Sequence, residues 1–319
     1  MNITVLGCGR WGSFLAWYNA QIGHSVTMFG RENGKSFLEL KNTGKNKWVT
    51  LDPRIKLSSD LKSAVEGADV VIISISSQEL RGLLKEVVKL DYKQKTFVLC
   101  MKGIEVSSGK RLTEVAVESG IAKDKVAVWV GPGHIQEFTK NKPNAMVIDS
   151  YDPVLTDRLI DIFKGPLIRF YHGSDIIGTE IGAAAKNIMG ILAGGLDGLG
   201  LTTMKGALMS RGAREVARLI KALGGNELSA YGLCHLGDYE ATLFSENSHN
   251  RKFGEALVKG VKFDHLAEGV ATAHAVSALA KKAGVEVPLT DGLCDVLNGA
   301  DVKDLMERLF AREVKTEFE

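Results

Sequence analysis

The stretch that decides the fold lies at the start of the chain, from Ile3 to Glu32, and reads ITVLGCGRWGSFLAWYNAQIGHSVTMFGRE. The apolar run at 3–7 predicts a buried strand, and the segment 10–23 predicts a helix that ends at Gly23. A second apolar run at 25–30 predicts another strand. This order predicts a β-α-β unit with two parallel strands.

Three glycines fill the turn between the first strand and the helix. Gly7 permits a tight turn, Gly9 lets the backbone approach a pyrophosphate, and Gly12 lets helix and strand pack closely. The start of the helix at Arg10 offers unpaired N–H groups and a partial positive charge to phosphates. In this strand–turn–helix context the glycine pattern predicts a dinucleotide site. The alternative is a glycine-rich turn that binds nothing.

The end of the second strand bears on which dinucleotide is bound. NAD-binding proteins usually carry an acidic residue there for the ribose 2′-hydroxyl. In this chain Gly30 takes the expected acidic position and Arg31 follows it. Because arginine can pair with a 2′-phosphate in bidentate fashion, we favour NADP(H). NAD(H) remains possible, since Glu32 could serve it in a shifted register.

The pattern of strands and helices changes in the middle of the chain. Near-continuous apolar runs at 69–76, 95–103 and 126–133 favour a parallel sheet buried on both faces. Beyond about residue 175, Ala- and Gly-rich helical segments replace the strands; they cover 178–195, 210–225 and 268–284. We expect an α/β protein with a Rossmann-type, doubly wound dinucleotide-binding domain at 1–175. An all-helical substrate-binding and catalytic domain at 176–319 should follow it.

Composition limits the class of protein. The chain has 319 residues, 40 of them basic and 38 acidic, for a net charge of +2. This near balance argues against a nucleic-acid-binding or membrane-surface protein. The four cysteines lie far apart without a C-x-x-C pattern, which predicts free thiols in a reducing compartment; they are Cys8, Cys100, Cys234 and Cys294.

We find no targeting sequence and no membrane-spanning stretch in this sequence. Met1 leads directly into the first apolar run, without a basic region or cleavage site. We judge that no stretch approaches the ~20 apolar residues of a membrane span. We therefore expect a cytoplasmic protein without stable membrane insertion.

Two segments that follow strands carry polar residues and glycines. Lys102 lies near the end of the run at 95–103, just past the expected strand, at the sheet edge where such folds bind ligands. The segment Gly131–Glu137, GPGHIQE, begins at the end of the run at 126–133, after the expected strand, and exposes backbone N–H groups around Pro132. The alternatives are a solvated surface lysine and a sharp turn without a ligand.

A third segment, EIGAAAKNIMG, places a lysine on a helix. Apolar residues form a stripe along one face of that helix; they are Ile177, Ile181, Ala184, Ile188 and Ile191. Lys186 falls on another face, with Gly182 and Gly190 one turn before and after it. Such small neighbours let the lysine lie against another backbone or a ligand. Burial and a nearby cation would lower its pKa and suit it to proton transfer.

The segment after residue 230 predicts a seat for phosphate. Asn247 or Ser248 is expected to cap a helix whose first turn holds His249, Asn250 and Arg251. Basic and amide side chains at a positive helix end favour a bound phosphate. Asp238, on the preceding glycine-rich stretch, could orient a lysine or a substrate hydroxyl, or serve as a turn or cap residue. No histidine shows metal-ligand spacing, so we predict no metal.

These pieces, in their order and spacing, resemble the bacterial type of NAD(P)-dependent glycerol-3-phosphate dehydrogenase along nearly the whole chain. The matching segments are GCGRWG, SSQELR, KGIE, GPGHIQE, EIGAAAKNI, GLDGLG, GDYEAT, SHNR and EGVATAHAV. The resemblance implies a fold like that of 6-phosphogluconate dehydrogenase. It also implies reversible hydride transfer between glycerol 3-phosphate and dihydroxyacetone phosphate, which supplies phospholipid synthesis, and a homodimer.

The resemblance also implies a role for individual residues. Lys186 matches the general acid/base, Lys102 a lysine that contacts substrate and cofactor, and Asp238 an aspartate beside the catalytic lysine; we assign these three as catalytic. The substrate-binding residues would be Lys102, Gly131, Gly133, Asp238, Ser248, His249 and Asn250. The cofactor-binding residues would be Gly7, Gly9, Arg10, Trp11, Gly12, Arg31, Lys102, Ile135, His249 and Glu268.

The chain departs from the family pattern in a few places. His249 stands where the family usually has an arginine that helps hold phosphate. Gly133, His134 and Gln136 replace a usual serine or threonine, a phenylalanine and a common basic residue, and Ser76 replaces a proline. Two other functions stay open: a related dehydrogenase of another hydroxy acid or sugar phosphate, and a non-catalytic dinucleotide sensor. Retention of both lysines speaks against the sensor.

Overall fold

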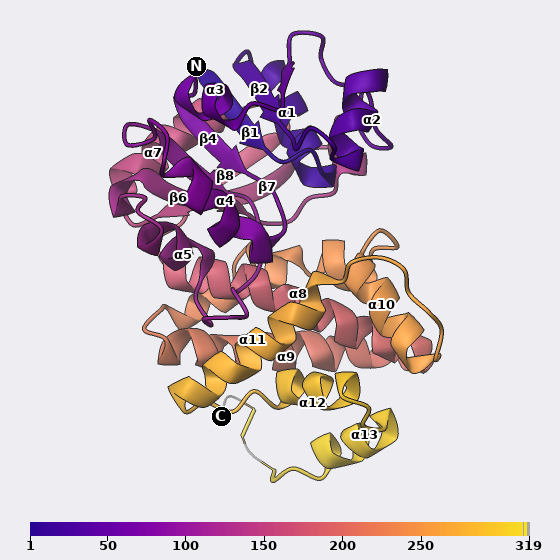
Figure 1. The fold of residues 1–319 in the computed structure, drawn as a ribbon. Helices are drawn as coiled ribbons and strands as arrows, with labels where there is room; N and C mark the ends of the chain where they lie inside the picture. The colour runs from indigo at the N-terminus through magenta and orange to yellow at the C-terminus, as the bar shows by residue number, and fades with distance from the viewer. Residues whose placement is uncertain (315, 318–319) are drawn as a thin grey trace. The chain divides into compact units, whose positions relative to one another are not determined.

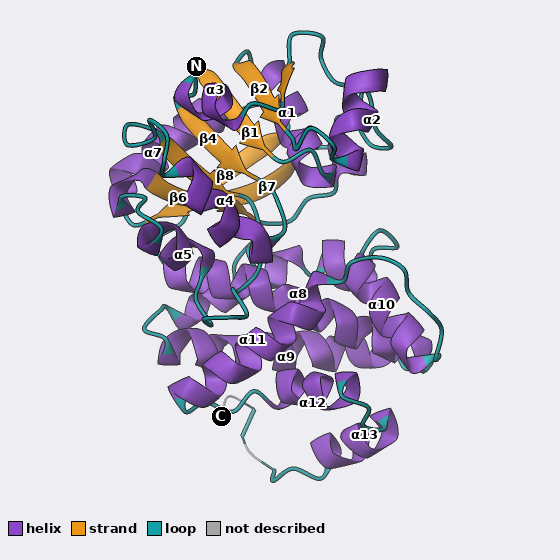
Figure 2. Ribbon diagram, in the orientation of Figure 1, coloured by secondary structure: helices purple, strands orange, loops and turns teal. Residues whose placement is uncertain are grey.

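The computed structural model describes residues 1–314 and 316–317 (Figure 1). The chain divides into two compact units, of which one comprises 1–102 and 112–176 and the other 103–111 and 177–319. The strands lie in the first unit, and helices dominate the second (Figure 2). The excursion at 103–111 is a feature that the hydrophobic pattern did not reveal.

The first unit contains one eight-stranded sheet in the order β3-β2-β1-β4-β5-β6-β7-β8. Its strands are β1 (Asn2–Leu6), β2 (Ser25–Phe29), β3 (Lys56–Ser58), β4 (Val70–Ile73), β5 (Thr96–Leu99), β6 (Val126–Val130), β7 (Asn144–Ser150) and β8 (Ile168–His172). The first six strands are parallel. Their order reverses between β1 and β4, which confirms the doubly wound Rossmann-type arrangement.

One strand departs from the expected parallel sheet. β7 runs antiparallel to β6, and β8 is parallel to β7. The only helix between β6 and β7 is α6 (Ile135–Phe138), which has four residues. A parallel crossover must return along the whole length of a strand and usually needs a longer helix for that purpose. The sheet is therefore mixed, and β3, β7 and β8 are strands that the sequence analysis did not identify.

Helices cover the sheet of the first unit (Figure 2). They are α1 (Arg10–Gln21), α2 (Lys35–Thr43), α3 (Leu61–Glu66), η1 (Ser77–Glu79), α4 (Leu80–Val87), α5 (Leu112–Glu118), η2 (Lys123–Lys125), α6 and α7 (Pro153–Phe163). Phe14 and Tyr18 of α1 pack in a buried aromatic cluster with Trp129 and Phe163. Aromatic packing of this kind fixes α1, and with it the glycine turn, against the sheet.

The second unit is helical. Its elements are α8 (Ile176–Gly198), η3 (Thr202–Met204), α9 (Lys205–Ala222), η4 (Glu227–Tyr231), η5 (Leu236–Asp238), the π-helix η6 (Glu240–Phe244), α10 (His249–Val258), α11 (Glu268–Ala283), α12 (Pro288–Leu297) and α13 (Val302–Phe310). The excursion belongs here because Ile104 is buried in the helical core. Arg111 also forms a buried ion pair with Glu180 of α8, with Nη1 and Oε2 2.7 Å apart.

α8 is the core helix of this second unit. Ile181, Ala184, Ile188 and Ile191 are almost fully buried, which confirms the predicted apolar stripe, and Ile177 is partly buried. The statement that no stretch approaches a membrane span was wrong by length and composition, because α8 has 23 residues and a mean hydropathy of 1.3. However, 83% of the apolar 18-residue stretch within α8 is buried inside the protein, as expected for the core helix of a helical unit.

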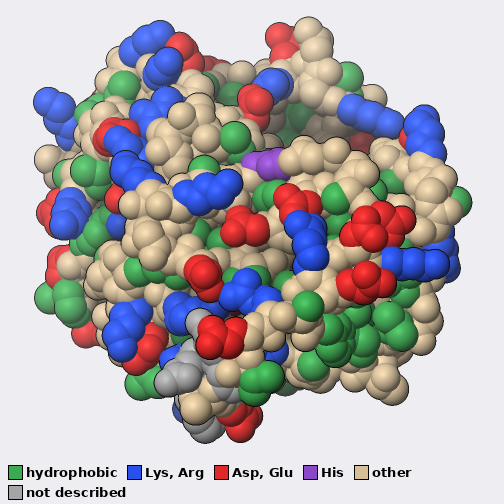
Figure 3. Space-filling view, turned by 90° about the horizontal axis from the view of Figure 1, so that it is seen from below, with side chains coloured by type: hydrophobic (Ala, Val, Ile, Leu, Met, Phe, Trp, Pro, Cys, Tyr) green, Lys and Arg blue, Asp and Glu red, His purple; other side chains and the backbone are tan. Residues whose placement is uncertain are grey.

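The charged side chains of the surface and the cysteine thiols agree with the near balance of charges and the spacing of the cysteines in the sequence. Figure 3 shows Lys and Arg side chains interspersed with Asp and Glu on the face that it presents, beside a group of hydrophobic side chains. All four cysteines are buried, and none of them forms a disulfide. Burial raises the pKa of Cys8 to about 12 and that of Cys294 to about 11, so both remain protonated thiols.

A buried carboxyl group joins α9 to α12. Glu215 is 1% exposed, and its oxygens accept hydrogen bonds from the backbone N–H groups of Leu289 and Thr290 and from the Thr290 hydroxyl. Burial raises the pKa of this carboxyl from 4.5 to about 7, although the same hydrogen bonds oppose the rise. The folded protein therefore keeps a proton here that the unfolded chain has already released.

This carboxyl predicts a pH dependence of stability. Its contribution is fully present below about pH 4.5 and is lost as the pH rises to about 7, since only the unfolded chain ionises freely in that window. In Glu215→Gln the melting temperature should fall less between pH 4.5 and 7 than in the wild-type protein. Thermal unfolding followed by circular dichroism measures this, with exposed Glu307→Gln as control. Equal slopes in all three proteins would contradict the assignment.

Candidate active site

The glycine turn after β1 is built for close packing at two positions and is open at the third. A Cβ on Gly7, whose φ is +125°, would lie 2.1 Å from the Ser74 carbonyl oxygen, and one on Gly12 would lie 2.1 Å from that of Gly7. A Cβ on Gly9 would meet no heavy atom within 4 Å among the described residues. The open space at Gly9 is where a pyrophosphate could approach the backbone, so the residues fit a bound dinucleotide.

The start of α1 is left available for an anion. Gly9 caps it without a side-chain hydrogen bond, and its first turn has no acidic residue, whereas Asp60 and Asp152 cap α3 and α7. Arg10 donates from Nη2 to Gln136 Oε1 at 3.1 Å, and its guanidinium lies 5.9 Å from the centre of the Trp48 ring. The exposed N–H groups and the helix dipole make this end attractive to phosphate.

The end of β2 excludes a side chain at the position where an acidic residue is usual. A Cβ on Gly30 would lie 2.6 Å from Cys8 Sγ and 2.7 Å from the Phe37 ring. Arg31 is exposed, and its Nη2 lies 3.2 Å from Oε2 of Glu79, which is also exposed. Exposed pairs of this kind are weak, so Arg31 can change partner at little cost.

Lys102 and the loop after β6 lie together in the first unit. Lys102 Nζ donates to the Gly131 carbonyl oxygen at 2.9 Å. Gly131 has a φ of +133°, and a Cβ on Gly133 would lie 2.6 Å from the Phe138 ring, which excludes the family's usual serine or threonine unless Phe138 moves.

The other two proposed cofactor residues of this region lie against aromatic or core side chains. Trp11 packs against Phe14 and Phe138, with ring centres 4.9 and 6.4 Å apart. The Ile135 side chain is buried in the core of the unit, so a cofactor could reach only the backbone there.

The second unit gathers a buried lysine, a carboxylate and a hydroxyl. Lys186 Nζ on α8 lies 3.0 Å from Asp238 Oδ2 and donates to Thr242 Oγ1 at 2.8 Å. The side chains of Lys186 and Asp238 are 12% and 1% exposed. Since burial of a lone charge is costly, each partner of this ion pair offsets part of the cost of burying the other. These two contacts fix the position of the Lys186 ammonium group, which is a potential proton donor.

Small residues on α8 make this arrangement possible. A Cβ on Gly182 would lie 3.0 Å from His235 Cβ, and one on Gly190 would lie 2.7 Å from Thr242 Cγ2. The predicted close approach on either side of Lys186 is therefore present, and the neighbours are the segments that carry Asp238 and Thr242.

A buried histidine and tyrosine hold the turn of Asp238. His235 Nδ1 lies 2.9 Å from the Gly182 carbonyl oxygen, and its Nε2 lies 2.8 Å from the Tyr239 hydroxyl. Burial lowers the pKa of His235 to about 4, so the ring is neutral. Because a carbonyl oxygen only accepts, Nδ1 donates to Gly182 and Nε2 accepts from Tyr239. The ring thereby ties the Asp238 turn to α8.

The start of α10 contains the predicted phosphate residues. Ser248 is its N-cap, accepting from the Arg251 N–H at 3.3 Å, which settles the choice between Asn247 and Ser248. Asn250 Oδ1 accepts from the Gly269 N–H at 3.0 Å, one residue after Glu268 at the start of α11. The Asn250 amide nitrogen therefore remains as the donor that can face a ligand.

His249 belongs to an aromatic group. Its ring stacks on that of His265 with centres 5.3 Å apart, and the Phe263 ring meets both edge-on. Arg251, the next basic residue, donates from Nε to Asp197 Oδ2 at 2.7 Å. Buried Lys205 shares the same carboxylate oxygen at 2.6 Å. Arg251 is thus committed to joining α10 to α8.

Sequence reasoning missed the supporting residues of the site. Thr242 lay within a matched segment, GDYEAT, but its hydroxyl gave no signal until η6 placed it beside Lys186. His235 gave no signal in the sequence, and its contact with Gly182 is visible only in the structure. Among the described residues, no group of three or more His, Cys, Asp or Glu side chains could hold a metal ion.

The Rossmann-type sheet and its glycine turn are typical of a dinucleotide-dependent dehydrogenase. Comparisons with known proteins agree. The family model described as the N-terminus of NAD-dependent glycerol-3-phosphate dehydrogenase matches residues 2–155, and the one described as its C-terminus matches 175–307. The chain belongs to the family of NAD-dependent glycerol-3-phosphate dehydrogenases.

Individual relatives span the whole chain. It is 37% identical to glycerol-3-phosphate dehydrogenase [NAD(P)+] of Moorella thermoacetica, covering 99% of this chain and 98% of that protein. It is 34% identical to the enzyme of the same name from Chlorobium limicola, with 99% of each covered. The crystal structure of glycerol-3-phosphate dehydrogenase from Coxiella burnetii is similar, with a TM-score of 0.90, 29% identity and coverage of 98% and 99%.

Proposed function

We propose that the protein interconverts dihydroxyacetone phosphate and sn-glycerol 3-phosphate with NAD(P)H as hydride donor, and so supplies glycerol 3-phosphate for phospholipid synthesis. The observation that carries the proposal is the contact of Lys186 with Asp238 and Thr242 in a chain of this family. The nicotinamide cofactor supplies the hydride when bound. The residues of this chain supply binding, orientation and the proton.

Lys186 acts as the general acid in ketone reduction. As the carbonyl carbon gains the hydride, the carbonyl oxygen takes a proton from Nζ, and the C=O bond becomes a C–OH group. In the reverse direction the neutral amine takes that proton back. Asp238 and Thr242 accept hydrogen bonds from Nζ and fix its position. The resemblance assigns to Lys102, which donates to the Gly131 carbonyl oxygen, a contact with substrate and cofactor.

The substrate phosphate is held at the start of α10. Ser248 and the Asn250 amide lie at this positive helix end, together with His249. Gly131 and Gly133 complete the substrate-binding set, as the resemblance implies. The dinucleotide is held by Gly7, Gly9 and Gly12 and by the start of α1, and the further cofactor contacts are Trp11, Ile135 and Glu268.

We also propose a homodimer in the cytoplasm, with a small phosphorylated triose as the only partner besides the cofactor. The near balance of 40 basic and 38 acidic residues, and the mixed charge of the one face shown in Figure 3, support a protein that binds neither nucleic acid nor a membrane. The buried position of α8 inside the helical unit supports the second point.

The reaction is tested by following the absorbance of the reduced nicotinamide in the presence of dihydroxyacetone phosphate or unphosphorylated dihydroxyacetone. We expect kcat/KM to fall about a thousandfold without the phosphate, because two charge-assisted hydrogen bonds of about 2 kcal/mol each are lost. Equal rates with the two ketones would contradict the proposed substrate. Bound cofactor without turnover of either ketone would point to the sensor.

For the cofactor we propose a preference for NADP(H). Exposed Arg31 supports it, as does the lack of room for a carboxylate at Gly30. Arg31→Ala should raise the KM for NADPH about tenfold, since the bidentate contact with the 2′-phosphate is removed. The KM for NADH should change little.

The matched control is Arg31→Lys, which keeps the charge and loses the bidentate geometry. Its KM for NADPH should lie between those of the wild-type protein and Arg31→Ala. Steady-state rates with each reduced cofactor measure all three proteins. An Arg31→Ala protein that retains its ratio of NADPH to NADH efficiency would contradict the assignment.

A further inference from the structure

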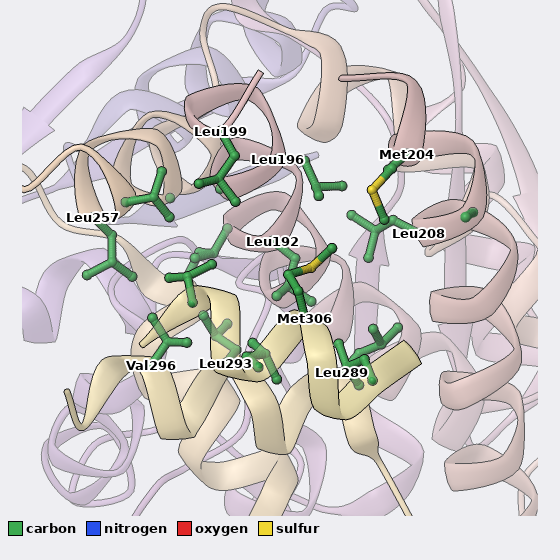
Figure 4. A pocket seen from close by; sticks show the side chains of 18 of the residues that line it. Leu192, Leu196, Leu199, Met204, Leu208, Leu257, Leu289, Leu293, Val296 and Met306 are labelled. Carbon is green, nitrogen blue, oxygen red and sulfur yellow. The ribbon is translucent and has the colours of Figure 1, made fainter. Parts of the chain in front are cut away.

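The helical unit contains an apolar cavity that the proposed reaction does not use. It has a volume of about 300 Å³ and lies among α8, α9, α10, α12 and α13 (Figure 4). Figure 4 shows Leu192, Leu196 and Met306 among the side chains that point into it. It is lined on several sides by Leu, Ile, Val and Met, so it offers a ligand an apolar hollow that opens to solvent rather than a flat patch.

The lining excludes water as a well-bound occupant. Arg211 is the only residue with a charged or polar side chain among those that line the cavity in the described part of the chain. A buried water needs two to four polar partners, which such a lining does not provide. An apolar group would fill the cavity without leaving a polar atom unpaired.

The cavity is open to ligands from the solvent. Leu199 and Phe310, which line it, are 39% and 73% exposed. Ala207 of α9 also lines it and is exposed. A chain-like molecule can therefore enter without opening the core.

Arg211 places a positive charge where the cavity meets an adjoining polar groove, since it lines both. The other charged residues of that groove are Glu215, Arg218, Lys221, Glu286, Arg312, Glu313 and Glu317. The Arg211 guanidinium donates to the Glu317 carbonyl oxygen at 2.7 Å, and it forms no ion pair with any residue that the structure describes. An exposed cation beside an apolar cavity is complementary to an amphiphile with an apolar chain and an anionic head.

We propose that this cavity binds the chain of a fatty-acid anion, with its carboxylate on Arg211. An apolar cavity of about 150 Å³ holds a benzene ring, so one of twice that volume accommodates roughly ten to twelve carbon atoms. The ligand class is a single-chain carboxylate of about that length. The site lies on α8 one to three turns beyond Lys186, yet its occupancy is independent of the proposed reaction.

The test is calorimetric titration of the full-length protein with hexanoate, octanoate, decanoate and dodecanoate below their micellar concentrations. Affinity should rise about fourfold per methylene, and it should level off once the cavity is full. Absence of saturable binding by decanoate and dodecanoate would overturn the proposal. So would a rise that continues unchanged beyond the cavity's capacity, which indicates non-specific association.

Variants locate the site. Ala207→Phe should abolish binding by filling the cavity, and it should fold, because Ala207 is exposed. Ser210→Phe adds the same ring on the same helix at an exposed position outside the cavity, and should bind as the wild-type protein does. Unchanged binding by Ala207→Phe would overturn the proposal.

The head group is tested by charge. Arg211→Gln should weaken decanoate binding about two- to fivefold, as expected for an exposed ion pair, and should leave binding of neutral decanol unchanged. Arg211→Lys should restore decanoate binding. A loss of affinity for decanol equal to that for decanoate would contradict the assigned carboxylate. A different outcome would point to a second copy of the chain over the cavity. In that case no fatty acid would bind to the wild-type protein, and the sedimentation coefficient of Ala207→Phe would differ from that of the wild type.

Discussion

The ion pair between Lys186 and Asp238 is the interaction on which the functional part of the helical unit depends. A buried charge is expensive, and two buried charges repay that cost only when their geometry and remaining hydrogen bonds are satisfied. Thr242 supplies one of those bonds, and His235 with Tyr239 fixes the turn that brings the carboxylate to the lysine. A lysine without this support would swing to solvent, where it could not deliver a proton to one chosen oxygen.

The surroundings of this ion pair in turn depend on the close packing of α8 against α10. A Cβ on Gly194 of α8 would lie 1.8 Å from the Arg251 carbonyl oxygen, and one on Gly254 of α10 would lie 1.9 Å from that of Ile191. Only glycine permits this approach, which brings Ser248, His249 and Asn250 toward the face of α8 that carries Lys186. The ion pairs of Asp197 with Arg251 and Lys205 join α8 to α10 and to α9. Burial acts to raise the pKa of Asp197, but the hydrogen bonds from these two cations outweigh it and lower the pKa, so the group stays charged.

The sequence predicted those parts of the fold whose causes are local. The turn Gly7–Gly12, the buried strand β4 and the stripe along α8 each follow from a short-range pattern of glycine or apolar residues. The antiparallel strand β7 could not be read in this way, because strand direction depends on the length of the connection and not on the residues of the strand. The entry of 103–111 into the helical unit was equally hidden, since it depends on Ile104 and on an ion pair between residues 69 positions apart.

The same distinction holds for the site. Lys186 was found because its small neighbours are on its own helix, and the cap at Ser248 because capping is a local event. Thr242 and His235 act across separate segments, so only the tertiary structure shows what they contact.

The most direct test of the central claim is chemical rescue of Lys186→Ala. The rate of ketone reduction should fall by about a thousandfold, as expected for loss of a general acid, with the KM for dihydroxyacetone phosphate little changed. Added ethylammonium should fill the space beside Asp238 and restore part of the rate in a saturable way, whereas neutral propanol should not. A Lys186→Ala enzyme that keeps more than about a tenth of the wild-type rate would show that the proton comes from another group.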